Sequence, residues 1–176
     1  MDNTTEKRLL ELLDKRDIEE SFLNYTRGVD RQDADLIRAA FHPDAIDNHT
    51  RAVRGSIEGM LEWWLPQQPQ REATQHFVTN QRIDLDGDSA HVETYFICII
   101  KHHGADDALF AGGRYVDRFE KRQGKWKIAL RVVLSEWQVE ADARAMRDLP
   151  GRVLPFSTRD KGDIVYSRPL VNPPPV

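Results

Sequence analysis

Cysteine is almost missing from the chain, which has one, Cys98, in 176 residues. A single cysteine excludes an internal disulfide bond and any zinc site built on several cysteines. Scarce cysteine is typical of proteins in a reducing compartment, and we therefore expect the protein in the cytoplasm. No neighbouring residue would activate the thiol, so we predict that Cys98 is a small apolar side chain in the wall of a pocket.

Long apolar runs are also missing. The longest apolar strings fall far short of the roughly 20 residues that a membrane-spanning helix needs. Residues 1–6 are polar and acidic, whereas a secretory signal has a basic region followed by an apolar one. The sequence thus predicts neither a membrane span nor a secretory signal.

Long basic runs are missing as well, and the formal net charge is −4. Binding to nucleic acids or to anionic membranes depends on clustered lysine and arginine side chains, so we expect neither as a partner. Hydrophobic residues make up 40% and charged residues 31%, which is typical of a globular protein. A chain of this length can form one domain with a substantial core.

Helical patterns occupy the N-terminal part of the chain. Leucines predict a short helix over residues 4–15. Asp17 followed by Glu20 predicts the start of a second helix, because the aspartate can cap it while the glutamate reaches back. Asp30 lies at the end of this second helix. Its apolar face consists of four residues at helical spacing: Ile18, Phe22, Tyr25 and Val29.

Two further helices are predicted. Asp33 can cap a third helix that ends at residues 42–44, because proline disfavours helix at the residue before it. A candidate strand follows over residues 45–49. A fourth helix is expected to begin at residues 55–56 and to end at the prolines of residues 66–69.

Strand patterns begin near residue 72. Four strand-like runs follow, separated by glycine-containing turns that suit hairpins: residues 73–85, 89–103, 109–122 and 125–138. Helices followed by an antiparallel meander are typical of an α+β protein. We therefore predict one domain over residues 1–140, in which N-terminal helices pack on a curved and mainly antiparallel sheet.

The run over residues 89–103 is apolar on both faces. Phe96, Cys98 and Ile100 point to one face, and the residues between them point to the other. Helices on one face would leave the second face in water, so we expect a homo-oligomer that covers it. The alternative is that a C-terminal segment covers this face.

The chain becomes irregular after Glu140. A short helix is predicted over residues 141–147, and prolines are frequent beyond it. We expect residues 141–176 to form a C-terminal extension that packs on the domain or on a neighbouring subunit, or that covers the pocket.

Asp30 and His76 are the candidate acid–base pair. Asp30 ends an amphipathic helix and His76 lies early in the first long strand, so they meet inside if the helix packs on the concave face of the sheet. A carboxylate that accepts from Nδ1–H fixes the tautomer of the imidazole and raises the basicity of Nε2. Such a pair can remove a proton from carbon next to an activating group. The alternative for His76 is a core histidine with satisfied hydrogen bonds.

Several segments resemble the SnoaL-like, scytalone dehydratase-like family of the nuclear transport factor 2-like superfamily. The segment that ends at Asp30 resembles the family's Tyr-x4-Asp helix end, and the segment around His76 matches the strand with its catalytic histidine. The other segments resemble the turn into the first strand and the last hairpin. The resemblance covers residues 8–138 and rests on residues 25–30, 41–45, 74–77, 112–115, 119–122 and 124–128.

The resemblance implies a cystatin-like, cone-shaped α+β barrel, often trimeric, that works without a metal or an organic cofactor; a dimer is the other oligomer we expect. It also implies that Asp30 and His76 are the His–Asp dyad of the family's lyases and that Tyr25 polarises the substrate. Arg131 falls where a related dehydrochlorinase has a pocket arginine. Four positions correspond to polar pocket residues of related enzymes but differ here: Cys98, Ile100, Arg114 and Val116.

Three further residues are predicted to line the pocket from their places in the elements: His49, Trp64 and Phe96. Arg131 is unusual on an apolar strand. Either it pairs with an acid such as Glu93 or Asp117, or it binds an anionic group of the substrate.

The sequence therefore predicts a cofactor-independent lyase of the dehydratase type, or an isomerase, that acts on a small hydrophobic oxygenated or ring compound. Two alternatives share the fold: a non-catalytic protein that binds a hydrophobic small molecule, and the structural small subunit of a ring-hydroxylating dioxygenase. The His–Asp pair argues against the structural subunit, because such a subunit does not need it.

Overall fold

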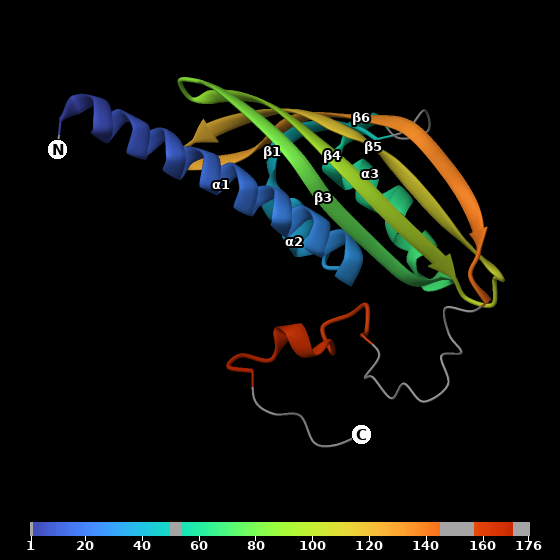
Figure 1. Cartoon of the computed structure of the whole chain (residues 1–176). Coiled ribbons are helices and arrows are strands. Elements are labelled where there is room, and N and C mark those ends of the chain that lie inside the picture. The colour runs from blue at the N-terminus through green and yellow to red at the C-terminus, as the bar shows by residue number, and fades with distance from the viewer. Residues whose placement is uncertain (1, 50–53, 145–156, 171–176) are drawn as a thin grey trace.

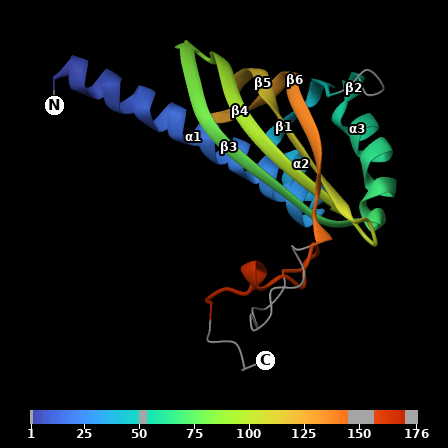
Figure 2. The ribbon, with the colours of Figure 1, turned by 45° about the vertical axis from the view of Figure 1, so that its right-hand side comes forward.

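The computed structural model describes residues 2–49, 54–144 and 157–170 (Figure 1). Three α-helices and six strands in these ranges form a cone, in which the helices pack on the concave face of a curved sheet (Figures 1 and 2). The predicted α+β architecture, with N-terminal helices on a curved and mainly antiparallel sheet, is confirmed.

Helix α1 (Asn3–Arg31) is a single helix of 29 residues. The prediction of two helices, over residues 4–15 and from Asp17, is wrong, because no proline or glycine interrupts the chain before Gly28. The apolar stripe is buried only from Ile18 onward, and the N-terminal half projects past the sheet with exposed leucines (Figure 1). None of the described helices is long and apolar enough to cross a membrane.

Helix α2 (Ala34–Ala40) leads directly into strand β1 (Phe41–Asn48), which begins earlier than the predicted residue 45. Pro43 lies inside this strand rather than between the two elements. It is tolerated because the pairing of β1 with its neighbour β6 is irregular between Phe41 and Ile46.

A short strand β2 (Arg54–Ser56), which the sequence pattern does not predict, pairs with β1 and precedes helix α3 (Ile57–Trp64). Ser56 Oγ accepts a hydrogen bond from the Gly59 N–H at 3.2 Å and caps α3. The predicted end of α3 is confirmed, since a 3-10 helix, η1 (Leu65–Gln70), follows it and contains both prolines.

Four long strands confirm the predicted runs: β3 (Arg71–Asp86), β4 (Ser89–His102), β5 (Asp107–Arg122) and β6 (Lys125–Asp142). The sheet order is β2-β1-β6-β5-β4-β3, and only β1 and β6 pair in parallel among these strands. The predicted helix over residues 141–147 is wrong at its start, because residues 141 and 142 continue β6 and pair with β5. Residues 145–147 lie outside the described chain.

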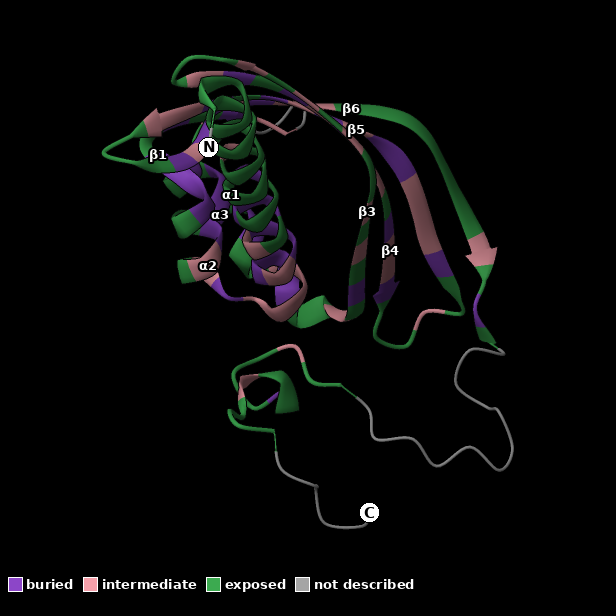
Figure 3. Cartoon of the chain, turned by 60° about the vertical axis from the view of Figure 1, so that its left-hand side comes forward, coloured by how far each residue is buried: buried purple, intermediate pink, exposed green. Residues whose placement is uncertain are grey.

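The core lies between the helices and the concave face of the sheet, where the buried residues gather (Figure 3). Phe22 and Tyr25 of α1 meet Phe41 and Tyr115 edge to face, with ring centroids 5.4–6.2 Å apart. This aromatic cluster fixes α1 against the sheet.

The convex face of the sheet carries exposed apolar side chains. Tyr95 and Ile97 of β4 are 40% and 38% exposed, and the alternating residues of β4 face inward as predicted. Residues 157–170 lie beside the C-terminal end of α1, where Lys161 contacts the carboxylate of Asp33, and not on this face (Figure 2). The alternative that a C-terminal segment covers the face is therefore wrong for these residues, and the homo-oligomer stays a prediction.

Candidate active site

A mostly apolar cavity of about 280 Å³ lies between the helices and the concave face of the sheet. Its walls come from α1, α3 and strands β3 to β6. The volume lies just below the range of about 300–1,000 Å³ that is typical of ligand pockets, so the cavity suits a compact ligand. Seven predicted site residues line it: Tyr25, His49, Trp64, His76, Phe96, Cys98 and Ile100.

Asp30 and His76 are in direct contact at the edge of this cavity. The ring Nδ1 of His76 lies 2.7 Å from Asp30 Oδ1, and the backbone N–H of His76 donates to Asp30 Oδ2 at 2.9 Å. Because an ionised carboxylate can only accept, Nδ1 carries a proton and Nε2 is the nitrogen left for a ligand. Both side chains are largely buried, with 9% of His76 and 15% of Asp30 exposed.

Gly28 allows α1 to end close to α2. A Cβ at this position would lie 2.8 Å from Ile37 Cγ1 and 3.0 Å from Asp33 O. The helix ends where Gln32 takes a φ of 55°, and the Asp33 N–H donates to Gly28 O at 2.8 Å. This tight turn sets the position of Asp30, which lies in the last turn of α1 and bonds to β3.

The Asp30 contact raises the pKa of His76. Burial opposes the charged form, but the hydrogen bond with Asp30 and the contact with Cys98, which pairs with His76 across β3 and β4, outweigh it and raise the pKa of His76 to about 9. At neutral pH the pair is therefore mostly an imidazolium and a carboxylate. A neutral fraction of roughly one in a hundred at pH 7 can act as a base.

Tyr25 lies five residues before Asp30 on α1 and is 1% exposed. Burial raises the pKa of the Tyr25 phenol well above its usual range, although the nearby Arg131 guanidinium opposes this shift. The phenol therefore stays protonated at all ordinary pH values and can donate a hydrogen bond into the cavity.

Arg131 does not line the cavity, which corrects the expectation that it acts as a pocket arginine. It is fully buried and donates to both carboxylate oxygens of Asp117, at 2.8 and 2.7 Å, so the pairing alternative is the one observed. Its guanidinium carbon lies 4.2 Å from the ring centroid of Tyr25 and 4.3 Å from that of Tyr115. Arg131 thus packs against the rings of two tyrosines that line the cavity, but it does not reach a ligand itself.

Arg114 and Val116 do not line the cavity either, contrary to expectation. Arg114 pairs with Glu93 at 2.5 Å and with Glu136 at 2.6 Å, and its guanidinium lies over the ring of Tyr95 on the convex face. Side chains alternate along a strand, and it is the buried Tyr115 between them that faces inward. An assignment that is off by one residue moves a side chain to the opposite face.

The cavity also contains residues that sequence reasoning did not single out. Alternation along β5 and β6 would have identified Tyr115 and Val133, because both share a face with inward neighbours. Arg71 had no such signal, since it follows the irregular η1 as the first residue of β3. Further residues missed are Val29, Met60, Leu109, Ala111 and Ser135.

A second contact between a histidine and an aspartate lies at the cavity. His49 Nδ1 is 3.5 Å from Asp47 Oδ2, and Asp47 is fully buried in β1. Within the described chain, neither Asp47 oxygen has a hydrogen-bond partner. Across residues 2–49, 54–144 and 157–170, no group of three or more histidine, cysteine, aspartate or glutamate side chains is arranged to hold a metal ion.

Several solved structures share this architecture. A hexachlorocyclohexane dehydrochlorinase of type 3 from Novosphingobium barchaimii is 16% identical, with a TM-score of 0.70 over 84% of this chain and 99% of that chain. A scytalone dehydratase-like protein from Novosphingobium aromaticivorans is 20% identical, with a TM-score of 0.69 over 82% of this chain and 97% of that one. A protein of unknown function with a cystatin-like fold from Nostoc punctiforme is 20% identical, with a TM-score of 0.59 over 70% and 92%. At these identities the likeness establishes the fold alone.

The sequence itself matches a family model. No curated protein sequence matches the chain. The model of the SnoaL-like domain, however, matches residues 10–132, which include α1 from its third turn, the whole of β3 to β5 and the first part of β6. Together with the cone of helices and sheet, this match shows that the chain belongs to the family of SnoaL-like domains.

Proposed function

We propose that the protein is a lyase or an isomerase that moves a proton on a small, mainly hydrophobic oxygenated compound held in the cavity. One observation carries the proposal: the 2.7 Å contact between Asp30 and His76, made at the wall of a mostly apolar cavity. Two solved structures with the same fold have names that describe a dehydrochlorinase and a dehydratase-like protein, which supports the same class of chemistry.

The first step is removal of a proton from carbon. Asp30 holds Nδ1, so that Nε2 of neutral His76 can take a proton from a carbon next to a carbonyl group. The Asp30 carboxylate then stabilises the imidazolium that forms. General acid–base assistance of this kind contributes about 10²–10⁴-fold in rate.

Tyr25 supplies the second group. Its protonated phenol donates a hydrogen bond to the substrate carbonyl or to the departing hydroxyl group, where negative charge develops. Arg131 only positions Tyr25, since it packs against the ring of this tyrosine and does not reach the cavity.

The proton leaves the imidazolium in the last step. Transfer to a departing hydroxyl releases water and makes the reaction a dehydration. Transfer to a different carbon of the same substrate makes it an isomerisation. Both outcomes use the same residues.

His76 lines the cavity, which favours turnover over a protein that only binds. The test is a panel of small ring ketones and β-hydroxy ring ketones incubated in D₂O with the protein and followed by NMR. We expect deuterium uptake next to the carbonyl, or loss of water, for at least one compound, and a decrease of about 10²–10⁴-fold in His76→Ala. His91→Ala, an exposed histidine on β4, is the control. Equal rates in His76→Ala and the control would refute the proposal.

A further inference from the structure

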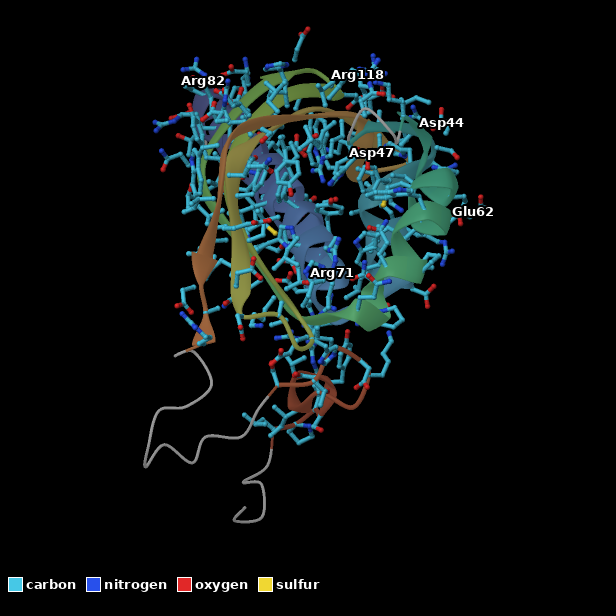
Figure 4. The ribbon with its side chains drawn as sticks, turned by 90° about the vertical axis from the view of Figure 1, so that its right-hand side faces the viewer. Asp44, Asp47, Glu62, Arg71, Arg82 and Arg118 are labelled. Carbon is cyan, nitrogen blue, oxygen red and sulfur yellow. The ribbon has the colours of Figure 1, made fainter. Side chains whose placement is uncertain are left out.

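Arg71 brings a positive charge to the same cavity as His76. It is the first residue of β3, five residues before His76, and both line the cavity. Figure 4 shows Arg71 inside the ring of strands and helices, whereas Arg82, on the same strand, lies outside. The guanidinium is thus placed to meet a ligand that contacts His76.

Within the part of the chain that the structure describes, the charge of Arg71 has no paired carboxylate. Nε of Arg71 is buried without a hydrogen-bond partner, and no carboxylate of the described residues forms an ion pair with Arg71. Burial lowers the pKa of Arg71, yet an arginine remains charged in proteins. Arg71 is only partly buried, but its buried Nε lacks a hydrogen bond, which is costly unless a ligand supplies one.

Arg159 adds a second positive charge at the same end of the cavity. It comes from the C-terminal segment and donates to Asp30 O at 3.3 Å, to Arg71 O at 3.1 Å and to Gln68 Oε1 at 3.0 Å. All of these acceptors are neutral. Burial, together with the charge of Arg71, lowers the pKa of Arg159 to about 10.

The nearby carboxylate does not balance the two arginines. Both oxygens of Asp30 are already used by His76, which is itself mostly protonated at neutral pH. Among the described residues, Arg71, Arg159 and His76 face only Asp30 at this end of the cavity, which leaves an excess of positive charge. Most of the other residues that line the cavity are apolar, with Phe96 among them.

We propose that the substrate is a small hydrophobic carboxylate, whose carboxylate group is bound by Arg71 while its apolar body lies against the strands near His76. A planar guanidinium matches a carboxylate with two parallel hydrogen bonds. Arg159 strengthens the positive potential at this end without contacting the substrate directly. The inference rests on the proposed function for the site it names, but carboxylate binding is measured without turnover.

The test compares two ligands of nearly equal shape, cyclohexanecarboxylate and cyclohexanecarboxamide, by calorimetric titration of the full chain. We expect the carboxylate to bind roughly 10- to 100-fold more tightly to the wild type, as for hydrogen bonds to charged groups. Arg71→Met should remove most of this preference while it leaves the affinity for the amide within about threefold. Arg71→Lys keeps the charge but not the planar guanidinium, so it should retain part of the preference for the carboxylate.

Arg82→Met is the matched control, because Arg82 is an exposed arginine on the same strand that pairs with Asp84 at 3.0 Å. Its ligand preference should equal that of the wild type. Binding of the amide by Arg71→Met shows that this variant is folded. A carboxylate preference as strong in Arg71→Met as in Arg82→Met, or one that is absent from the wild type, would overturn the inference.

The two proposals fail separately. If no compound undergoes proton transfer but the wild type still prefers the carboxylate, only the proposed function is wrong. If the wild type shows no preference for the carboxylate but deuterium uptake depends on His76, only the inference of a carboxylate substrate is wrong.

Discussion

The carboxylate of Asp30 accepts two hydrogen bonds from one residue, His76, through its ring Nδ1 at 2.7 Å and through its backbone N–H at 2.9 Å. The backbone bond ties the last turn of α1 to β3, and the ring bond sets the tautomer of the imidazole. One side chain thus stabilises the fold and prepares the base, so changes at Asp30 affect both.

The pH dependence of the reaction follows from the raised pKa of His76. With a pKa of about 9, the base form is the minor form at neutral pH. If neutral His76 removes the proton, kcat/KM should increase about tenfold per pH unit below pH 8 and level off above about pH 9. Initial rates from pH 6 to 10 measure this. A rate that decreases over this range would instead mean that the imidazolium acts first as an acid.

Stability should depend on pH through the same group. The folded protein binds the His76 proton with a pKa of about 9, compared with an ordinary value of 6.5. This contribution is therefore fully present below pH 6.5 and is lost as the pH increases through 9. In full, this contribution to the free energy of unfolding is on the order of 3 kcal/mol. Urea denaturation of the wild type between pH 6 and 10 should show the decrease, and His76→Gln should lack this component.

His91→Gln is the control for this measurement, since His91 is exposed on β4. Its free energy of unfolding should follow the wild-type pH dependence. The same slope in His76→Gln as in the wild type would assign the pH dependence to other groups.

Arg131 should matter for stability more than any surface arginine. It is fully buried against Asp117 and two tyrosine rings, so Arg131→Met leaves a buried carboxylate without its partner. We expect a loss of about 3–5 kcal/mol in the free energy of unfolding. Urea denaturation gives this value.

Two variants control for the loss of Arg131. Arg118→Met removes an exposed arginine of the same sheet, which pairs with Glu120 at 3.0 Å, and should cost less than about 1 kcal/mol. Arg131→Met combined with Asp117→Leu should recover much of the stability, because both charges are then removed. A single Arg131→Met as stable as Arg118→Met would show that the buried pair is not formed.

Gly28 should not tolerate a side chain. A Cβ at Gly28 would approach the side chain and backbone of Ile37 to 2.8 and 2.9 Å, so Gly28→Ala must push α2 away from α1. We expect a loss of about 1–3 kcal/mol measured by thermal or urea denaturation. Gly59→Ala in α3 has its nearest atom at 3.5 Å and should be neutral or stabilising by up to about 1 kcal/mol. Equal effects of the two substitutions would contradict the close approach.

The sequence was sufficient for the fold and for the central pair, because both depend on strong periodic patterns. The helical stripe that contains Tyr25 predicts which face of α1 is buried, and Asp30 follows it directly. The alternation of β4 likewise predicts that Phe96 and Cys98 share one face, and the resemblance to the SnoaL-like family implies that this face lines the pocket. The prediction of two N-terminal helices was wrong because Asp17 resembles a cap but follows no helix breaker.

Other site residues depend on details that the sequence does not carry. Arg114 and Val116 were assigned to the wrong face, and the pairing of β5 with β6 is irregular between Gly112 and Gly113, close to them. Arg71 enters the cavity where an irregular 3-10 segment joins a strand, so no period predicts its direction. The partner of Arg131 depended on which of two acids on neighbouring strands faces inward.

The most direct test of the central claim is an NMR titration of the His76 imidazole in the wild type and in Asp30→Asn. We expect a pKa of about 9 for His76 in the wild type. In Asp30→Asn the pKa should decrease clearly below this value, because burial is then opposed only by the contact with Cys98. Asp35→Asn, an exposed aspartate on α2, should leave the titration unchanged. A wild-type pKa near 6.5 that does not respond to Asp30→Asn would contradict the account.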